Sequence, residues 1–188
     1  MRKMYVVFVL LVISMAAAAV ASAQDKGQVG LNLGYPSVGV TWHVSDRVAV
    51  RPEFTFSFGS SSSTAGSGVE ASDSDAWGVA FGVSALFYVA EWDGVKGYVA
   101  PRLAALLSDA DRVSATTDST SASSSSGWDL GVMMGAQYSL NPRFSVFGEI
   151  GFAYARRHSE SEFLDSLIME NDSWTLGPRT AIGLILYF

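Results

Sequence analysis

The sequence offers few side chains for catalysis or metal binding. Its 188 residues include no cysteine and only two histidines. The lack of cysteine excludes a disulfide framework, thiolate metal ligands and a thiol nucleophile. His158, Ser159 and Glu160 contain the residue types of a hydrolytic triad. Adjacent residues of an extended segment point to opposite faces, however, and a triad needs side chains that converge. We therefore expect no enzyme activity, no metal site and no cofactor.

Most of the chain after residue 27 alternates between large apolar and small or polar residues. This period of two predicts β-strands with two different faces. The alternation is clear in residues 48–58, 76–87, 128–138 and 173–188, less regular in 95–107 and 144–155, and weak in 28–34 and 38–44. We predict eight strands from these segments. Pro52, Pro101 and Pro178 fall inside them, where a proline removes a ladder donor, so we expect β-bulges at these positions.

Five charged residues lie on the small-residue face near the middle of the predicted strands. These residues are Arg51, Glu53, Arg102, Glu149 and Arg179. A buried charge without a partner is very costly, so we expect the five side chains to pair in an Arg/Glu layer. The residues expected to extend this network toward its ends are His43, Lys96, Tyr98 and Asp129.

The predicted connections alternate between short and long. Residues 45–47, 90–94 and 139–143 read as tight turns, whereas 59–75, 108–127 and 156–173 are long and largely rich in Ser. Short turns on one side and long loops on the other are typical of outer-membrane barrels. We therefore predict an all-β, eight-stranded antiparallel up-and-down transmembrane β-barrel. Its short turns would be periplasmic and its long Ser-rich loops extracellular.

The composition of the two faces decides which one meets lipid. The small-residue face lacks the density of Lys, Glu and Asp that a solvated surface carries. An eight-stranded barrel has an interior only wide enough for side chains to fill, so this face suits the inside. Trp77, Trp128 and Trp174 each begin a predicted strand directly after a polar segment, which predicts an extracellular aromatic belt. The alternative is a soluble periplasmic lipocalin-like binder with the faces reversed.

The first residues have the pattern of an export signal. Arg2 and Lys3 precede an apolar run, and Ala21-Ser22-Ala23 forms an A-x-A cleavage site. We predict a cleaved signal peptide over residues 1–23 and a barrel domain over 24–188; a retained membrane anchor is the alternative. The formal charge of −6 argues against nucleic-acid binding.

The last nine residues, Thr-Ala-Ile-Gly-Leu-Ile-Leu-Tyr-Phe, alternate and end on Phe188. Together with the signal peptide and the eight strands, they make the chain resemble the small outer-membrane β-barrels, a group that includes the OmpA transmembrane domain, OmpX and the Ail adhesins. The resemblance implies location in the outer membrane of a Gram-negative cell envelope and a lumen plugged by the Arg/Glu network. It also implies that Phe188 belongs to the signal read by the barrel assembly machinery during biogenesis.

The expected function follows from this fold. We expect a structural or surface-interaction role, with outer-membrane lipid, lipopolysaccharide and a surface partner of the loops as its contacts. Arg156 and Arg157 lie at the loop end of a predicted strand, where they would bind lipopolysaccharide phosphates through bidentate hydrogen bonds. The alternatives are a lipid A-modifying barrel and a small-solute transport barrel.

Overall fold

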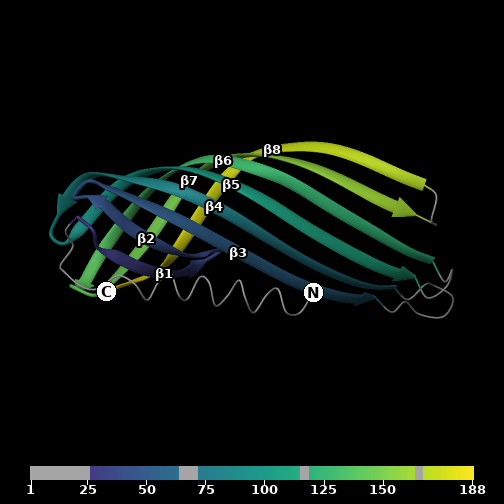
Figure 1. Ribbon diagram of the computed structural model, residues 1–188, viewed down its shortest axis with the longest axis horizontal. Coiled ribbons are helices and arrows are strands. Elements are labelled where there is room, and N and C mark those ends of the chain that lie inside the picture. The colour runs from purple at the N-terminus through teal and green to yellow at the C-terminus, as the bar shows by residue number, and fades with distance from the viewer. Residues whose placement is uncertain (1–25, 64–71, 115–118, 164–166) are drawn as a thin grey trace.

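The chain folds into eight antiparallel strands that close on themselves. The computed structural model describes residues 26–63, 72–114, 119–163 and 167–188. The strands are β1 Val29–Tyr35, β2 Val38–Ser45, β3 Val48–Ser63, β4 Ser72–Trp92, β5 Val95–Ser114, β6 Ser119–Asn141, β7 Phe144–Phe163 and β8 Leu167–Tyr187. Each strand pairs with the next, and β1 pairs with β8 (Figure 1). The predicted fold class, an eight-stranded antiparallel barrel, is confirmed. The described residues contain no helix long and apolar enough to cross a membrane.

The tight turns lie at one end of the barrel, beside the C-terminus (Figure 1). The turn between β4 and β5 consists of Asp93 and Gly94, both with positive φ. Two consecutive residues of positive φ match the right-handed twist of the flanking strands, which is why this turn needs Gly or a short polar residue. Between β6 and β7, the Arg143 N–H donates to Asn141 Oδ1 over 2.9 Å. The predicted periplasmic turns therefore correspond to real two-residue connections.

At the other end the strands extend farther than the sequence suggested. The Ser-rich segments expected as loops continue the ladders, so that β3 runs to Ser63 and β4 starts at Ser72. An antiparallel hairpin needs only backbone pairing and cross-strand contacts to continue once its register is set. Such a contact joins Ser161 Oγ to Ser123 Oγ over 3.1 Å. Residues 64–71, 115–118 and 164–166, between the strand ends, lie outside the described residues.

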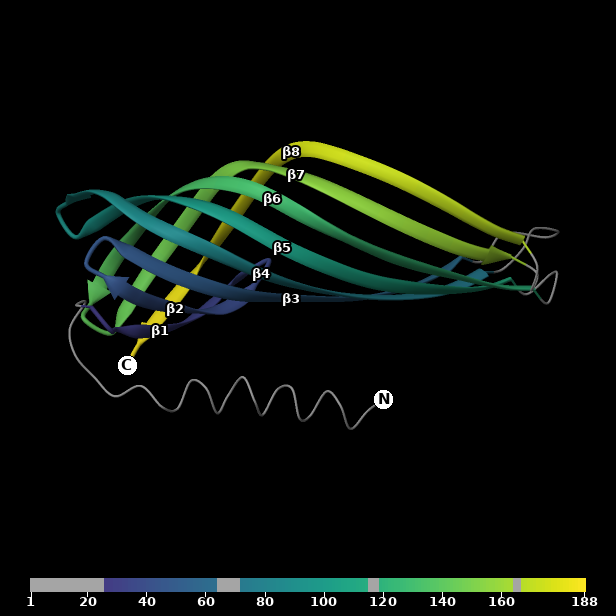
Figure 2. The same ribbon diagram turned by 45° about the horizontal axis from the view of Figure 1, so that its top comes forward.

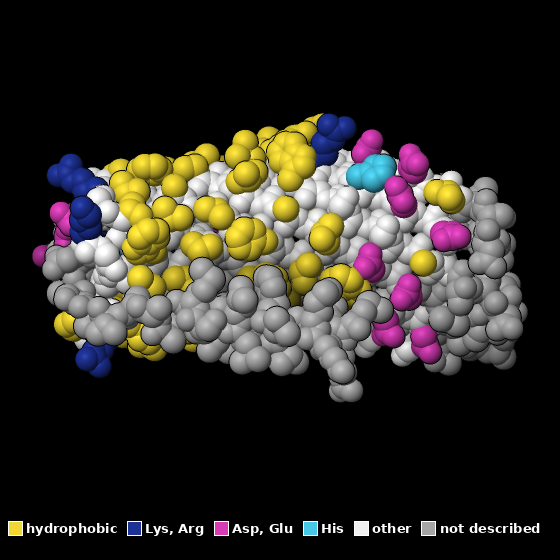
Figure 3. Space-filling view, in the orientation of Figure 1, with side chains coloured by type: hydrophobic (Ala, Val, Ile, Leu, Met, Phe, Trp, Pro, Cys, Tyr) yellow, Lys and Arg dark blue, Asp and Glu magenta, His cyan; other side chains and the backbone are white. Residues whose placement is uncertain are grey.

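The large apolar residues point out of the barrel, as the alternation predicts. Phe58 and Ile182 keep 78% and 68% of their surface exposed. Small or polar residues occupy the inside, together with two buried clusters: Ala49, Leu86, Tyr98, Ala100 and Met133 in one, and Phe147, Ile185 and Tyr187 in the other. Hydrophobic side chains cover much of the visible face, and acidic ones gather toward the end away from the turns (Figure 3). This distribution suits a barrel wall in hydrocarbon.

The prolines inside strands are not at bulges, so that expectation is wrong. The register shifts among the described strands occur at His43/Ser45, Tyr88/Ala90 and Ser139/Asn141, close to the turns. Beside Pro52 the β2–β3 ladder lacks two pairs but resumes in the same register, and the β4–β5 ladder does the same beside Pro101. The missing donor is therefore accommodated by a local loss of ladder bonds rather than by an extra residue.

The barrel is closed over only part of its length, because β1 and β2 are much shorter than their neighbours. Pairing between β1 and β8 ends at Tyr35 and Ile182, and pairing between β2 and β3 ends at Val38 and Phe54. Farther from the turns, residues 55–63 of β3 and 167–181 of β8 have no strand partner on this side among the described residues. Figures 1 and 2 show β3 to β8 continuing as a curved sheet beyond β1 and β2. We call the inner face of this sheet the trough, and the gap between its β3 and β8 edges the lateral notch.

Candidate functional site

Six charged side chains meet inside the closed part of the barrel. They come from five strands, and they are Arg51, Glu53, Arg102, Asp129, Glu149 and Arg179. The set holds three cations and three anions, so its formal charge is zero. We call it the charged layer. All five residues singled out in the sequence belong to it, and Asp129 joins them.

Arg51 binds two carboxylates within this layer. Its Nη1 and Nη2 lie 2.7 and 2.9 Å from Oε1 and Oε2 of Glu149, an arrangement that holds both oxygens at once. Its Nε donates to Glu53 Oε1 over 3.1 Å. The guanidinium also lies 5.3 Å from the ring centroid of Phe147, and Tyr98 Oη donates to Glu149 Oε1 over 2.8 Å. Arg51 therefore ties β3 to β7 through the lumen, and the hydrogen bond from Tyr98 ties β5 to the same glutamate.

Arg102 and Arg179 bind the other side of the layer. Arg102 Nη1 lies 2.5 Å from Asp129 Oδ1, and its Nε lies 3.4 Å from Glu53 Oε2. Arg179 Nη1 lies 3.3 Å from Asp129 Oδ2. Asp129 therefore bridges two guanidinium groups. The side chain of Arg179 is 24% exposed, whereas those of the other five are between 2% and 11% exposed.

Two serine hydroxyls also donate hydrogen bonds to the carboxylate of Glu53. Ser84 Oγ donates to Oε1 over 2.6 Å, and Ser37 Oγ donates to Oε2 over 3.0 Å. Neither serine was predicted to belong to the charged network. Ser84 could have been found from its inward position on β4. Ser37 lies in the bend between β1 and β2, where the alternation of a strand does not tell which way a side chain points. Hydrogen bonds to the ionised form make a buried carboxylate tolerable in the barrel interior.

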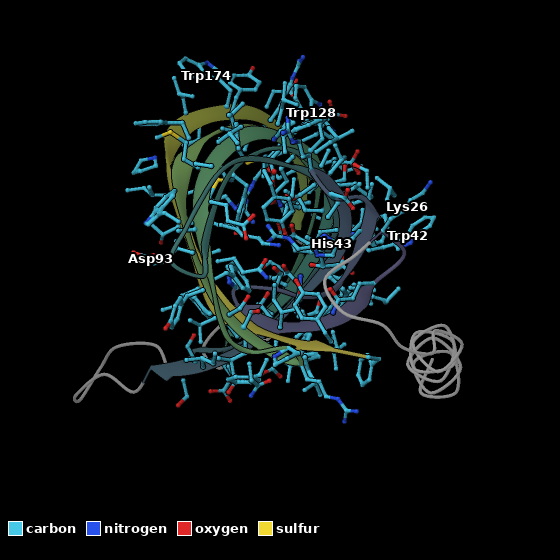
Figure 4. All side chains as sticks on the ribbon, turned by 90° about the vertical axis from the view of Figure 1, so that its left-hand side faces the viewer. Lys26, Trp42, His43, Asp93, Trp128 and Trp174 are labelled. Carbon is cyan, nitrogen blue, oxygen red and sulfur yellow. The ribbon has the colours of Figure 1, made fainter. Side chains whose placement is uncertain are left out.

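A polar cluster lies between the charged layer and the turns. His43 Nε2 lies 3.2 Å from Tyr187 Oη, which accepts a hydrogen bond from Gln137 Nε2 over 2.9 Å. Tyr88 Oη donates to Gln137 Oε1 over 3.1 Å, and its ring stacks on His43. Figure 4, viewed along the barrel, shows His43 pointing inward, whereas Trp42 points outward. His43 and Tyr98 thus lie in the lumen as expected; no ion pair of Lys96 occurs within the described residues.

The predicted rim residues divide between the two faces. Arg156 pairs in register with Trp128 and Trp174, which puts all three on the outer face, and Tyr154 packs between the two indoles with ring centroids 5.6 and 6.2 Å away. Trp128 and Trp174 point outward in Figure 4. Arg157 is exposed but takes the opposite face, because neighbouring residues of a strand alternate.

The three adjacent residues with triad-like chemistry do not converge. His158 Nδ1 lies 3.1 Å from Asp172 Oδ1, and its Nε2 lies 3.4 Å from Glu160 Oε1. Hydrogen bonds to Asp172 and then Glu160 raise the pKa of His158 above its ordinary value. Ser159 Oγ donates instead to the backbone oxygen of Asn171 over 3.3 Å. Among the described residues, no three His, Asp or Glu side chains are arranged so that they could hold a metal ion.

Phe188, the last residue, and Trp77, the third predicted belt tryptophan, both lie on the outer surface of the barrel. The Phe188 N–H donates to the Val29 oxygen over 3.0 Å, and the Phe188 ring is exposed. Trp77 is exposed on β4, opposite Phe58 of β3. Aromatic side chains therefore occur on the outer face near both ends of the barrel.

Comparisons with known proteins agree with this architecture. The sequence model of the outer membrane protein beta-barrel domain matches residues 7–178. No curated protein matches the chain. Among solved structures, a major outer membrane protein from Thermus thermophilus is similar, with a TM-score of 0.56, 14% identity, and 86% of this chain and 98% of that chain covered. CarO of Acinetobacter baumannii has a TM-score of 0.45 and 13% identity, with 89% and 100% covered. The chain belongs to the outer membrane protein beta-barrel domain family.

Proposed function

We propose that this outer-membrane barrel is non-conducting and non-enzymatic, with a structural or surface-interaction role. The observation that supports this proposal is the charged layer, which links β3, β5, β6, β7 and β8 across the lumen. An ion crossing the barrel would have to separate buried charge pairs whose attraction is strengthened by their low-dielectric surroundings. The polar cluster around His43 fills the next level toward the turns.

The exposed part of the sheet is the surface available to a partner. Its outward side chains include a series of acidic residues, namely Asp73, Asp75, Asp109, Asp111, Glu160, Glu170 and Asp172. We propose that a surface partner, if bound here, meets this negative face. Residues 1–23 are proposed as a cleaved signal peptide, and Phe188 as part of the assembly signal; the former lie outside the described residues.

Arg156 is proposed as the lipopolysaccharide contact. It lies on the outer face between Trp128 and Trp174, at the level of the aromatic belt. A guanidinium at this level would meet phosphate groups of the outer leaflet and could bind them through two parallel hydrogen bonds. Arg157 lies on the opposite face of the sheet. Substituting Arg157 therefore controls for the loss of one positive charge at nearly the same height.

Conductance measurements test the closed lumen. Purified protein inserted into a planar bilayer should show no unitary current steps. The double variant Arg51→Ala with Glu149→Ala removes one cation and one anion from the charged layer, so it opens space without leaving a net charge, and it should conduct. The control, His158→Ala with Glu160→Ala, removes a pair on the exposed outer face and should remain silent. Current steps in the wild-type protein would refute the proposal.

A further inference from the structure

We infer that two copies of this chain pair through their lateral notches, with β3 of each copy joined to β8 of the other. The two curved sheets then form one closed ring above the bend at Pro36 and Ser37, and each copy keeps its own closed barrel and charged layer below it. This dimer goes beyond the role proposed above, because it assigns a partner to the part of the wall that one copy leaves open.

The free edges of the notch reach into the membrane. Trp174 on β8 and Trp77, which pairs with Phe58 of β3, lie in the aromatic belt. From this level toward the turns, the edge of β8 stays unpaired as far as its last pair with β1 at Ile182, and the edge of β3 as far as Phe54. Lipid offers no hydrogen-bond partner to a backbone, so an open sheet edge does not face hydrocarbon. A strand from a second chain satisfies both edges.

Alternate residues present their backbone groups to the notch. The Tyr88 N–H donates to the Arg47 carbonyl, and the β3–β4 register is unbroken, so even-numbered residues of β3 face the notch. The Phe188 N–H donates to Val29 on the β1 side, so even-numbered residues of β8 face the notch as well. On both strands the even-numbered residues also carry the outward side chains. An antiparallel ladder between the two edges therefore keeps outer side chains together and trough side chains together.

The membrane leaves one symmetric way to join these edges. Both copies point the same way across the bilayer, so two β3 strands, or two β8 strands, would run parallel. A two-fold axis along such a pair turns one sheet over, and the lipid side of one copy would continue as the trough side of the other. Because β3 runs away from the turns and β8 runs toward them, β3 pairs with β8 of the second copy without this reversal (Figure 1). One two-fold axis then closes both notches.

A proline on β8 indicates where the new ladder begins. Pro178 faces the notch but has no N–H to donate, so Leu176 is the first residue above it that offers both a donor and an acceptor. On β3, the first notch-facing residue beyond the last pair with β2, at Phe54, is Phe56. Matching Phe56 with Leu176 sets the register. The hydrogen-bonded pairs are then Phe56 with Leu176, Phe58 with Trp174, Ser60 with Asp172, and Ser62 with Glu170.

The outward side chains are complementary in this register. Near the belt, exposed apolar residues of one copy meet exposed apolar residues of the other. Farther from the membrane, the hydroxyls of Ser60 and Ser62 lie opposite carboxylates, to which they can donate. One of these carboxylates, Glu170, forms no ion pair within the described part of the chain. The carboxylates of Asp73 and Asp75 on β4 are two strand spacings away, about 10 Å, where salt screens the repulsion.

The trough side of the interface is small and open. A Cβ atom added at Gly59 of β3 or Gly177 of β8 would meet nothing within 4 Å, so no side chain of the same copy blocks the approach. The residues that pair on this side are small or polar: Thr55 with Gly177, Ser57 with Thr175, Gly59 with Ser173, and Ser61 with Asn171. The two troughs therefore join into one polar chamber that lies above two charged layers.

The closed parts of the two barrels allow this approach. Below the bend, the outer faces of the two β1–β2 hairpins face each other, with Leu33, Tyr35 and Trp42 exposed on them. Sheets packed face to face lie about 10 Å apart, whereas paired strands lie about 4.8 Å apart. The free ends of β3 and β8 thus close a gap of about 5 Å over the length of the notch.

Disulfide cross-linking tests the pairing of unlike strands. The chain contains no cysteine, so single cysteines report contacts between copies. Ser57→Cys carrying a size tag and untagged Thr175→Cys, reconstituted together in liposomes, should form a disulfide with each other, because the register places their Cα atoms about 4.5–5.5 Å apart. Neither variant alone should cross-link. Asn171→Cys is the matched control: it faces the trough about 13 Å farther along β8 and should not react with Ser57→Cys.

Ser60→Pro tests the backbone ladder itself. It removes an N–H that faces the notch and leaves the β3–β4 ladder intact. Because each dimer loses this hydrogen bond twice, the dissociation constant measured by sedimentation equilibrium in detergent should rise about tenfold. Ser60→Ala removes the hydroxyl but keeps the N–H, so it should raise the constant by less than about threefold.

Four results would overturn the inference. Disulfides in Ser57→Cys alone or in Thr175→Cys alone would show pairing of like strands. The absence of a disulfide between these two variants, or a wild-type protein that stays monomeric, would show that water or another protein fills the notch. Equal dissociation constants for Ser60→Pro and Ser60→Ala would exclude the ladder. Gel mobility without boiling confirms that each variant is folded, and conductance tests the closed lumen separately.

Discussion

Neutralising Glu149 should destabilise the barrel far more than neutralising an exposed glutamate. In Glu149→Gln, Arg51 loses the charge of its nearest carboxylate and retains only Glu53 as an ion-pair partner among the described residues. The charged layer would then hold three cations and two anions. Tyr98 can still donate to the amide oxygen of the new side chain. The substitution therefore removes charge while preserving shape and most hydrogen-bonding capacity.

The magnitude follows from the ion pair, with its closest contact at 2.7 Å, and from the hydrogen bond that Nη2 donates over 2.9 Å. A hydrogen bond to a charged group contributes about 1.5–3 kcal/mol, and removing one partner of a buried ion pair costs about 3–5 kcal/mol. Because the glutamine oxygen can still accept one hydrogen bond from Arg51, we expect a loss of about 3 kcal/mol in the free energy of unfolding. Arg51→Met combined with Glu149→Gln should cost less than the two single changes added together, with a coupling of about 1–3 kcal/mol.

Guanidinium titration of the protein in liposomes, followed by tryptophan fluorescence, measures this loss. The chain carries five tryptophans, which report the transfer of the barrel wall out of lipid. Glu160→Gln is the matched control, because Glu160 lies on the exposed outer face and its ion pair within the described part of the chain is with His158. An exposed pair of this kind contributes little to stability, because water screens the two charges. Equal unfolding free energies for Glu149→Gln and Glu160→Gln would refute the view that the charged layer stabilises the barrel.

Three further predictions concern the membrane, its surface and pH. Unboiled protein from the outer-membrane fraction should migrate faster on SDS gels than boiled protein, and a soluble periplasmic fraction without a mobility shift would contradict the barrel in lipid. Arg156→Glu should lower the lipopolysaccharide that co-purifies with the protein, whereas Arg157→Glu should not; equal amounts in both variants would remove the proposed contact. The pKa of His158 is raised in the fold by Asp172 and Glu160, so its protonation stabilises the exposed β7–β8 hairpin. This contribution is fully present below the ordinary histidine pKa and is lost as pH rises through the raised value. Amide exchange of the hairpin should accelerate across that range, and His158→Ala should abolish the dependence.

The wall of the barrel could be predicted because its two faces obey different constraints. Lipid-facing positions accept large apolar side chains, and lumen positions below the bend must fill a narrow interior. Arg51, Glu53 and Glu149 occupy inward positions in otherwise apolar segments, which marks them as partners of one another. Their distances could not be predicted, because these depend on the stagger of strands that are far apart in the sequence. The same stagger explains why Asp129 bridges two arginines instead of lying at the edge of the network.

The length of the strands was harder to predict from the sequence than the direction of their side chains. Ser-rich segments lack the apolar alternation that marks a strand, yet a paired backbone continues through them once the hairpin is in register. The cross-strand contact between Ser161 and Ser123 is one that any run of serines would permit, so composition alone cannot distinguish it from a loop. Ser37 was missed for a related reason, since a residue in a bend has no period to reveal the direction of its side chain.

The short first hairpin explains the difference between the two halves of the molecule. A strand can close a barrel only as far as it extends, so the bend at Pro36 and Ser37 determines where β8 and β3 lose their partners. Below that level, inward positions on β3 carry Arg51 and Glu53, which reach across the lumen to fill it. Above it the same face carries Ser57 and Gly59, because an open trough needs no filling. On β8 the inward residues include buried Tyr187 and Ile185 near the turns and Gly177 beside the notch, with Arg179 of the charged layer between them. The inward side chains of β3 thus become smaller beyond the level at which β2 ends, which is the level where the β3 edge loses its partner above the charged layer.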